Sequence, residues 1–248
     1  MNFIDIFQEY SINGYAKIGN VLDSDLSQSI LKEIKNSKDT VTYFDNKNII
    51  RRIEKVYNKG NKLNQLNNKI LDILYNIFSE KYIIFKDKYN AKPPGGEGFY
   101  PHYDGIFNWE NQQGEIKDGW YEYCPEFINV LVALDDTNDL NGTIEVAKID
   151  NSSFDTLISK TKKNGTPEIL EDIAKTLEFE KINLNRGDGV IFSHKCPHRS
   201  AINKTNKSRR IIYYTYNSLK YGDNYNNYFE DKLTSNPEKK IHKALSSK

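Results

Sequence analysis

Several residue types are scarce in this sequence, and each shortage excludes a class of protein. The chain has only 2 cysteines, Cys124 and Cys196, which form neither a disulfide framework nor a C-x-x-C pair, so a reducing compartment is expected. No apolar run approaches the roughly 18 residues of a membrane helix, and the first residues lack the pattern of a signal peptide. We therefore predict a globular, cytoplasmic protein with no membrane association.

An excess of charge of one sign is also missing. The 35 Lys and Arg residues are balanced by 34 Asp and Glu residues, which leaves a net charge of +1. A nucleic-acid-binding protein normally carries a basic excess on one face, so we predict that the chain binds no nucleic acid. Arginine is scarce, and its positions are therefore informative: Arg51, Arg52, Arg186, Arg199, Arg209 and Arg210.

Aromatic residues, in contrast, make up 12% of the chain, with 17 Tyr and 12 Phe. This content argues against disorder. A chain of 248 residues can bury about three-quarters of its unfolded surface in one core. No repeat, low-complexity tract or linker marks a second domain, so we predict a single domain over residues 1–248, with a polar tail at 236–248.

The N-terminal part follows helical periodicity. Apolar residues recur at three- and four-residue spacing in residues 3–10, after a cap at Asp23 or Ser24, and in residues 63–78. We predict amphipathic helices at these places, with one short strand at 15–18 between the first two.

Short β-prone segments replace this pattern after Glu80. They lie at 82–89, 127–134, 143–147, 181–184, 190–192, 198–202 and 209–216. One further helix is predicted near 167–177. Many short strands with helices gathered at the front predict a mainly β fold with helices (α+β). We expect a β-barrel or jelly-roll core at 81–220, backed by a mainly helical segment at 1–80.

A metal site is indicated by His102-Tyr103-Asp104. Residues i and i+2 of a strand point to the same face, so His102 and Asp104 can hold one ion together. His198, far along the chain, supplies a third ligand. Two histidines and one carboxylate form the facial triad of non-haem Fe(II) oxygenases, so we predict an iron site at these three residues.

A facial triad leaves room for a co-substrate. In such a site 2-oxoglutarate takes two of the open positions and O2 takes the last. The distal carboxylate of 2-oxoglutarate requires a planar, permanently charged, bidentate partner, which is Arg rather than Lys. Arg209 opens the strand after His198, and Ser200 points to the same face as His198.

Several motifs resemble the phytanoyl-CoA dioxygenase family. They are His102-Tyr103-Asp104, the segment 187–192, Pro197-His198-Arg199-Ser200 and Ser208-Arg209-Arg210. The resemblance extends from about Gly14 to about Lys232, and it is strongest toward bacterial enzymes that hydroxylate small aminoalkylphosphonates. It implies a double-stranded β-helix of the cupin type, Fe(II), 2-oxoglutarate, and hydroxylation of an unactivated C–H bond. By position it assigns His102, Asp104 and His198 to iron, and Arg209 and Ser200 to the distal carboxylate of 2-oxoglutarate.

The resemblance leaves part of the co-substrate site open. In the family a lysine before the triad sometimes assists 2-oxoglutarate, which makes Lys88 and Lys92 candidates. Tyr103 departs from the family pattern, because a Gln that lines the co-substrate pocket usually stands between the two ligands.

The expected substrate is a small zwitterion, with an anionic head and an ammonium group. Cations near the metal motifs, Arg199 with Lys88 and Lys92, are suited to a phosphonate, and the aromatic residues of 105–125 offer faces to an ammonium. That segment is either core or a lid over the site. The candidates for substrate contact are Tyr103, Arg199, Trp109 and Trp120.

Other functions remain as alternatives. A halogenase must leave the carboxylate position to halide, and Asp104 fills that position. A non-catalytic jelly roll that binds a metal or ligand has no need of Arg209 and Ser200. A dioxygenase for natural-product or acyl substrates stays open, although no basic run serves the phosphates of an acyl-CoA. The oligomeric state stays open as well.

A zinc site is the last alternative. His194 and His198 have the spacing of a helical metal pair, with Cys196 between them. Pro197 and its β-prone neighbours disfavour a helix there, so we expect His194 to lie outside the metal site.

Overall fold

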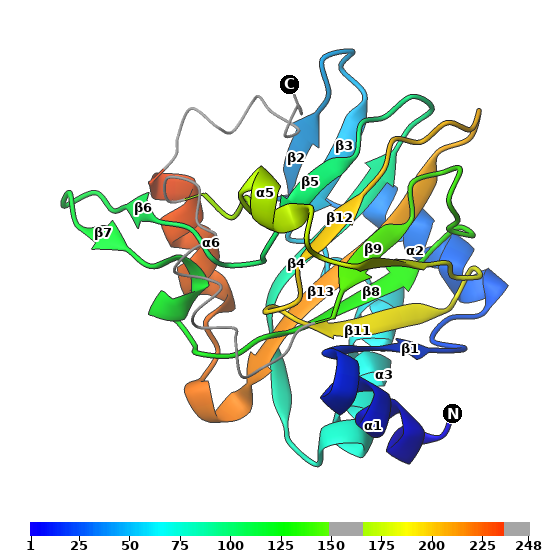
Figure 1. Cartoon of the computed structure of the whole chain (residues 1–248), viewed down its shortest axis with the longest axis horizontal. Coiled ribbons are helices and arrows are strands. Elements are labelled where there is room, and N and C mark those ends of the chain that lie inside the picture. The colour runs from blue at the N-terminus through cyan, green and yellow to red at the C-terminus, as the bar shows by residue number, and fades with distance from the viewer. Residues whose placement is uncertain (149–165, 236–248) are drawn as a thin grey trace.

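Two antiparallel sheets form the core of the computed structural model, which describes residues 1–148 and 166–235 (Figure 1). The larger sheet has the order β1 (Tyr15–Ile18), β11 (Gly189–Ser193), β8 (Ile128–Ala133), β13 (Arg209–Ser218), β4 (Tyr82–Lys92), β3 (Ile50–Glu54) and β2 (Val41–Phe44). The smaller sheet has the order β10 (Phe179–Ile182), β9 (Ile144–Ala147), β12 (His198–Ser200) and β5 (Phe99–His102). This arrangement is a double-stranded β-helix, as predicted. The polar tail expected at 236–248 lies outside the described residues.

Alternate residues of the central strands face two different cores. On β8, Val130 and Val132 pack on the helical side of the sheet, whereas Leu131 packs between the two sheets. On β13, Tyr214 and Tyr213 divide in the same way. Because successive side chains of a strand point to opposite faces, a strand covered on both sides is apolar at nearly every position. The continuous apolar run that predicted β8 has this origin.

The predicted N-terminal helices are present as α1 (Phe3–Asn13), α2 (Ser24–Asn36) and α3 (Asn61–Phe78). The Asp23 side chain accepts a hydrogen bond from the Leu26 backbone N–H at 2.7 Å and caps α2. The buried stripes of α2 and α3 share one core with the outer face of the larger sheet. None of the described helices has the length and apolar character needed to cross a membrane.

The sequence prediction missed β2, β3 and α6 (Tyr225–Thr234). Strand β3 carries Arg51 and Arg52 at its centre, which removes the alternation that marks a strand. The helix expected near 167–177 is reduced to the single turn α5 (Glu171–Ala174). Two short elements were also missed: the hairpin of β6 (Trp109–Glu110) with β7 (Ile116–Lys117), and the 3-10 helix η2 (Leu219–Tyr221).

The segment 105–125 is attached to the core at its base. The 3-10 helix η1 (Gly119–Glu122) buries Trp120, whose ring packs edge-on against Phe85 at 5.4 Å between centroids. Gly105 has φ +80° and lies under the same ring, where an added Cβ would come within 2.6 Å of a ring carbon. The β6–β7 hairpin projects outward from this base (Figure 1). A lid function for 105–125 stays a prediction.

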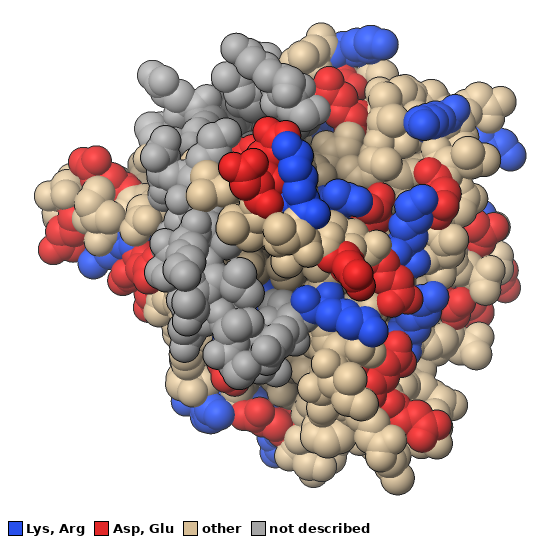
Figure 2. Space-filling view, viewed as in Figure 1, with Lys and Arg blue, Asp and Glu red and all other residues tan. Residues whose placement is uncertain are grey.

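Charge on the outside of the molecule is mixed. On the face shown in Figure 2, Lys and Arg residues are interspersed with Asp and Glu residues. This view agrees with the net charge of +1.

A buried carboxylate joins β3 to α6. Glu54 is fully buried and accepts hydrogen bonds from the Tyr43 hydroxyl at 3.2 Å, from Arg52 at 3.5 Å, and from the Lys232 ammonium. Burial raises the pKa of Glu54, but attraction to Lys232, Lys86 and Arg52 outweighs it, so this pKa lies well below its usual range.

We predict that Glu54→Gln lowers the free energy of unfolding by about 3–5 kcal/mol at neutral pH, because the buried cations lose their carboxylate. A depressed pKa contributes stability that is complete above the unfolded value of about 4.3 and is lost as the pH falls further. Urea denaturation from about pH 6 to about pH 3 should therefore show the difference from wild type shrinking. The exposed Glu178→Gln is the matched control, and a difference that stays constant over this range would contradict the prediction.

Candidate active site

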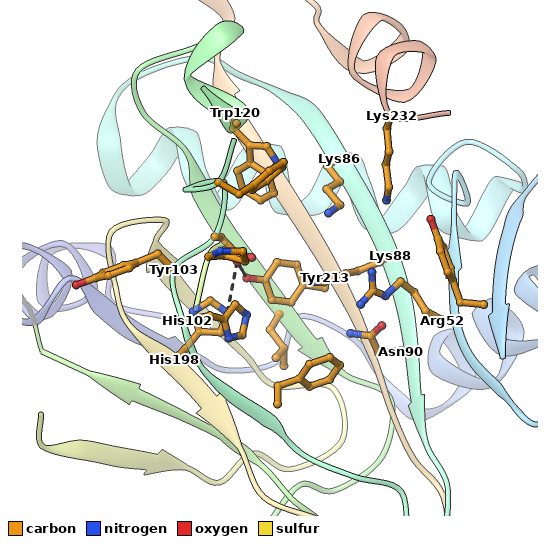
Figure 3. Close-up of a pocket in the computed structure, with 18 of the residues that line it drawn as sticks. Arg52, Lys86, Lys88, Asn90, His102, Tyr103, Trp120, His198, Tyr213 and Lys232 are labelled. Atoms are coloured by element: carbon orange, nitrogen blue, oxygen red, sulfur yellow. Dashed lines mark hydrogen bonds and ion pairs between the residues drawn. The ribbon is translucent and has the colours of Figure 1, made fainter. Parts of the chain in front are cut away.

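The three predicted iron ligands meet between the two sheets. His102 ends β5 and His198 begins β12, and these residues lie directly opposite each other in the paired strands. Their ring centroids are 4.1 Å apart, and the Asp104 carboxylate lies 3.5 Å from His198 Nε2 (Figure 3). One donor atom from each residue lies within 4.8 Å of the others. Among the described residues, no other group of three or more His, Cys, Asp or Glu side chains is placed to hold a metal ion.

Backbone carbonyls determine which nitrogen each histidine offers. His102 Nδ1 lies 2.8 Å from the Tyr100 carbonyl, and His198 Nδ1 lies 3.1 Å from the Cys196 carbonyl. Because a carbonyl can only accept, each Nδ1 carries the proton and each Nε2 keeps its lone pair for a metal. Burial lowers the pKa of His102 to about 3 and also lowers that of His198, so both rings are neutral at pH 7.

Two donors hold the Asp104 carboxylate in place. The Tyr213 hydroxyl and Asn129 Nδ2, the latter at 3.1 Å, both donate to Oδ2. Thr215 in turn donates to Asn129 Oδ1 at 2.8 Å, which fixes the orientation of the amide. The carboxylate is therefore oriented by side chains from β8 and β13.

The donor set fits Fe(II). Burial raises the pKa of Asp104, whereas His198, Lys88 and the Tyr213 hydroxyl together lower it to well below its usual range. The site thus presents one carboxylate and two neutral imidazoles, which is the ligand set of non-haem iron oxygenases. These three side chains would hold the ion.

A cavity of about 650 Å³ opens beside the triad. Strand β4 contributes a row of polar side chains to it, because every second residue faces the cavity: Lys86, Lys88, Asn90 and Lys92. The residues between them face the helices. Asp87, for example, accepts a hydrogen bond from the Tyr225 hydroxyl of α6 at 2.7 Å.

The predicted co-substrate residues meet at one end of this cavity, which we call the closed end (Lys92, Ser200, Arg209). Lys92 Nζ donates to Ser200 Oγ at 2.8 Å, and both Lys92 and Arg209 donate to the Gly142 carbonyl, at 3.2 and 2.9 Å. Arg209 Nε is buried without a hydrogen-bond partner. Within the described residues neither cation has a carboxylate partner.

Burial lowers the pKa of Arg209 to about 10 and that of Lys92 to about 6. Arg51, which the sequence did not single out, lines the same end. With a pKa of about 6, Lys92 is mostly neutral at pH 7 until an anion binds beside it, whereas Arg209 stays charged without a counter-ion. The two groups together leave a place for a carboxylate, and the distal carboxylate of 2-oxoglutarate fits it.

The two candidate lysines occupy different places. Lys92 lies at the closed end, whereas the Lys88 ammonium lies over the Tyr213 ring, 3.8 Å from its centroid, beside the triad (Figure 3). On β4 the inward-facing residue Asn90 lies between Lys88 and Lys92. Lys88 therefore lies beside the iron ligands and away from the closed end.

The structure places the four residues that were predicted to contact the substrate in different surroundings. Trp109 and Trp120 line the cavity, although Trp120 is buried in the core. Tyr103 is buried, and its ring points away from the two histidines (Figure 3). Arg199 follows His198 on the strand and points to the opposite face, where it pairs with Glu145 at 2.8 Å. The guanidinium of Arg199 thus lies away from the iron ligands.

Besides Arg51, the polar cavity residues that the sequence analysis did not assign to the site include Arg52, Lys86, Asn90 and Lys232. Lys86 and Asn90 alternate with Lys88 and Lys92, so the period of the predicted strand was a usable signal. Arg52 and Lys232 lie on β3 and α6, which the sequence did not predict.

The structure does not assemble the alternative zinc site. His194 Nε2 lies 3.2 Å from the Tyr121 hydroxyl, and its Nδ1 contacts the Phe127 backbone. Cys196 Sγ donates to the Gly14 carbonyl. These two side chains are therefore directed away from His198.

Known proteins resemble the chain over most of its length. A family model described as Phytanoyl-CoA dioxygenase (PhyH) matches residues 10–211. Methylphosphonate hydroxylase from Gimesia maris is 31% identical over 167 residues, which cover 67% of this chain and 57% of that protein. The 2-aminoethylphosphonate dioxygenase of an uncultured bacterium is 27% identical over 249 residues, covering 92% and 87%. The chain thus spans little more than half of the first of these relatives.

Solved structures share the fold. EctD from S. alaskensis, solved with bound Fe, has a TM-score of 0.66 at 17% identity, covering 86% of this chain and 76% of its own. The epimerase SnoN, solved with Fe3+, alpha ketoglutarate and nogalamycin RO, has a TM-score of 0.65 at 14% identity, covering 86% and 82%. At such identities the likeness shows the double-stranded β-helix.

We predict that Ala at His102, Asp104 or His198 lowers bound iron and turnover by at least about 100-fold, because each change removes a ligand. Metal analysis of the purified variants measures iron per chain. His194→Ala is the control and should keep its iron, with melting curves to verify folding. Retention of iron by Asp104→Ala together with its loss from His194→Ala would show that the ligands are assigned wrongly.

Arg209→Lys should weaken the binding of 2-oxoglutarate and leave the binding of iron unchanged. Loss of a bidentate buried ion pair raises the apparent 2-oxoglutarate constant roughly 30-fold to several thousand-fold, with iron content unchanged. Arg210→Lys is the matched control, because Arg210 pairs with Asp135 at 2.6 Å. If Arg210→Lys weakens 2-oxoglutarate binding and Arg209→Lys does not, the distal carboxylate of 2-oxoglutarate binds Arg210 instead of Arg209.

Proposed function

The chain belongs to the phytanoyl-CoA dioxygenase family of 2-oxoglutarate-dependent oxygenases, and from this premise we propose that it hydroxylates a small organophosphonate. The reaction consumes O2 and 2-oxoglutarate and releases succinate and CO2. The observation that carries the proposal is that one cavity is lined by the triad and by two groups of cations. Arg209 and Lys92 lie at the closed end, and Lys88 and Arg52 come from the neighbouring strands β4 and β3.

The chain's own residues have separate tasks. His102, Asp104 and His198 hold the iron, which together with 2-oxoglutarate supplies the oxidant when both are bound. Arg209 and Ser200 orient 2-oxoglutarate through its distal carboxylate. Burial of these groups keeps water away from the reacting centre.

An aminoalkylphosphonate is the specific substrate that we propose. Two relatives support this choice, since their names are methylphosphonate hydroxylase and 2-aminoethylphosphonate dioxygenase. Cations on the substrate side of the triad support it as well, because a phosphonate carries up to two negative charges. Trp109 and Trp120, which line the cavity, would pack against the carbon chain of the substrate.

A succinate-formation screen tests the function. Protein supplied with Fe(II), O2 and 2-oxoglutarate is given methylphosphonate, 2-aminoethylphosphonate, glycine betaine or an acyl-CoA. We expect a phosphonate to raise succinate release on the order of tenfold over the rate without substrate, and Asp104→Ala to abolish the rise. Stimulation by acyl-CoAs or neutral hydrocarbons, with none from any phosphonate, would refute the proposed substrate class.

A further inference from the structure

We infer that Arg52, Lys88 and Asn90 form the subsite for the anionic head of the substrate, and that this head alone is recognised. An ammonium group on the substrate then adds little to binding. This inference rests on the proposed function and widens its substrate class from aminoalkylphosphonates to phosphonates, or chemically equivalent anions, with or without an amine.

Strand register brings the three side chains together. Arg52 on β3 lies directly opposite Asn90 on β4, and Lys88 lies two residues before Asn90 on the same face. Lys88 is in turn opposite Tyr213 on β13. All three side chains line the cavity beside Tyr213, whose hydroxyl points away from them toward the iron ligands and donates to Asp104, as Figure 3 shows.

These groups have unused hydrogen-bonding capacity. Asn90 Oδ1 is buried without a hydrogen-bond partner. The Lys88 ammonium contacts the Tyr213 ring and makes no hydrogen bond or ion pair within the described residues. Arg52 makes a single ion pair, 3.5 Å long, to Glu54. A buried polar group without a partner is costly. A bound phosphonate would satisfy all three groups, because its anionic oxygens accept from Lys88 and Arg52 and its remaining P–OH donates to Asn90 Oδ1, which can only accept.

The charge of the cavity favours an anion. Apart from Arg199, which pairs with Glu145 on the opposite face, seven Lys and Arg residues but only two carboxylates, Asp104 and Asp231, are among its described lining residues. Asp104 serves the iron, and Asp231 accepts a hydrogen bond from the Tyr123 hydroxyl. The mixed outer face in Figure 2 has no comparable excess, so the positive charge is concentrated inside. The distal carboxylate of 2-oxoglutarate would offset the closed end only.

Lys86 and Lys232 line the end of the cavity opposite the closed end, which we call the open end. There, the chain's own cations lie over the faces of the aromatic rings. Lys86 lies over the rings of Trp120 and Tyr228, at 5.2 and 5.5 Å from their centroids. Lys232 lies 5.5 Å from the Tyr43 ring centroid. A substrate ammonium at these rings would meet like charges and not an open face. The rings of Trp120, Tyr228 and Tyr43 are therefore not open to a substrate ammonium.

The test compares two nearly isosteric ligands. Calorimetric titration of protein loaded with Fe(II) and 2-oxoglutarate under nitrogen is done with 2-aminoethylphosphonate and with propylphosphonate, in which a methyl replaces the ammonium. We expect the two dissociation constants to agree within about threefold, and choline, a cation alone, not to bind. A preference of more than about tenfold for 2-aminoethylphosphonate, or the absence of any phosphonate binding, would overturn the inference.

Variants locate the subsite. Each of three variants should weaken the binding of propylphosphonate at least about tenfold: Lys88→Met, Arg52→Met and Asn90→Leu. Iron content and 2-oxoglutarate binding should stay unchanged. Lys35→Met, which removes an exposed charge on α2, is the matched control. Unchanged phosphonate binding in all three variants would place the head group elsewhere.

Failure of the proposed function gives a different result. If phosphonates bind in a Lys88-dependent manner but none stimulates succinate release, the subsite stands and the proposed reaction on phosphonates does not.

Discussion

Burial of three lysines on one strand is the constraint on which the site depends, because burial is the largest cause that lowers the pKa of each. Lys86, Lys88 and Lys92 all project from β4 into the same cavity. Glu54 offsets Lys86 at the open end, and Asp104 offsets Lys88 beside the triad. At the closed end Lys92 has only a hydroxyl and carbonyl oxygens. The protein alone therefore balances two of the three charges and leaves the third to a ligand.

The sequence predicted those parts of the molecule whose signal is local. The double-stranded β-helix was predicted, and the structure brings together His102, Asp104 and His198. His102 is the last residue of β5 and Asp104 lies two residues beyond it, so the strand period alone does not place this pair of ligands. Arg199 shows the limit of proximity in sequence. It is adjacent to a ligand, and the same period directs it to the opposite face, where it binds Glu145.

Other parts could not be predicted, because their signal is absent from the segment itself. Strand β3 is stable in the larger sheet through pairing with β2 and β4 on its two sides, although its own residues do not alternate. Helix α6 has three buried aromatic residues that pack on the core, with polar neighbours between them. Tertiary packing decides both elements. Arg52 and Lys232 were missed for this reason.

The contact between Gly105 and η1 separates two parts of the molecule that are neighbours in sequence. The backbone N–H of Trp120 donates to the Gly105 carbonyl at 3.0 Å, and an added Cβ at Gly119 would lie 2.0 Å from the same oxygen. The two ends of the β6–β7 excursion are thus fastened together one residue after Asp104. Insertions, deletions or a grafted loop between residues 109 and 117 would leave the geometry of the iron ligands intact, so this hairpin is the natural place to engineer access to the cavity.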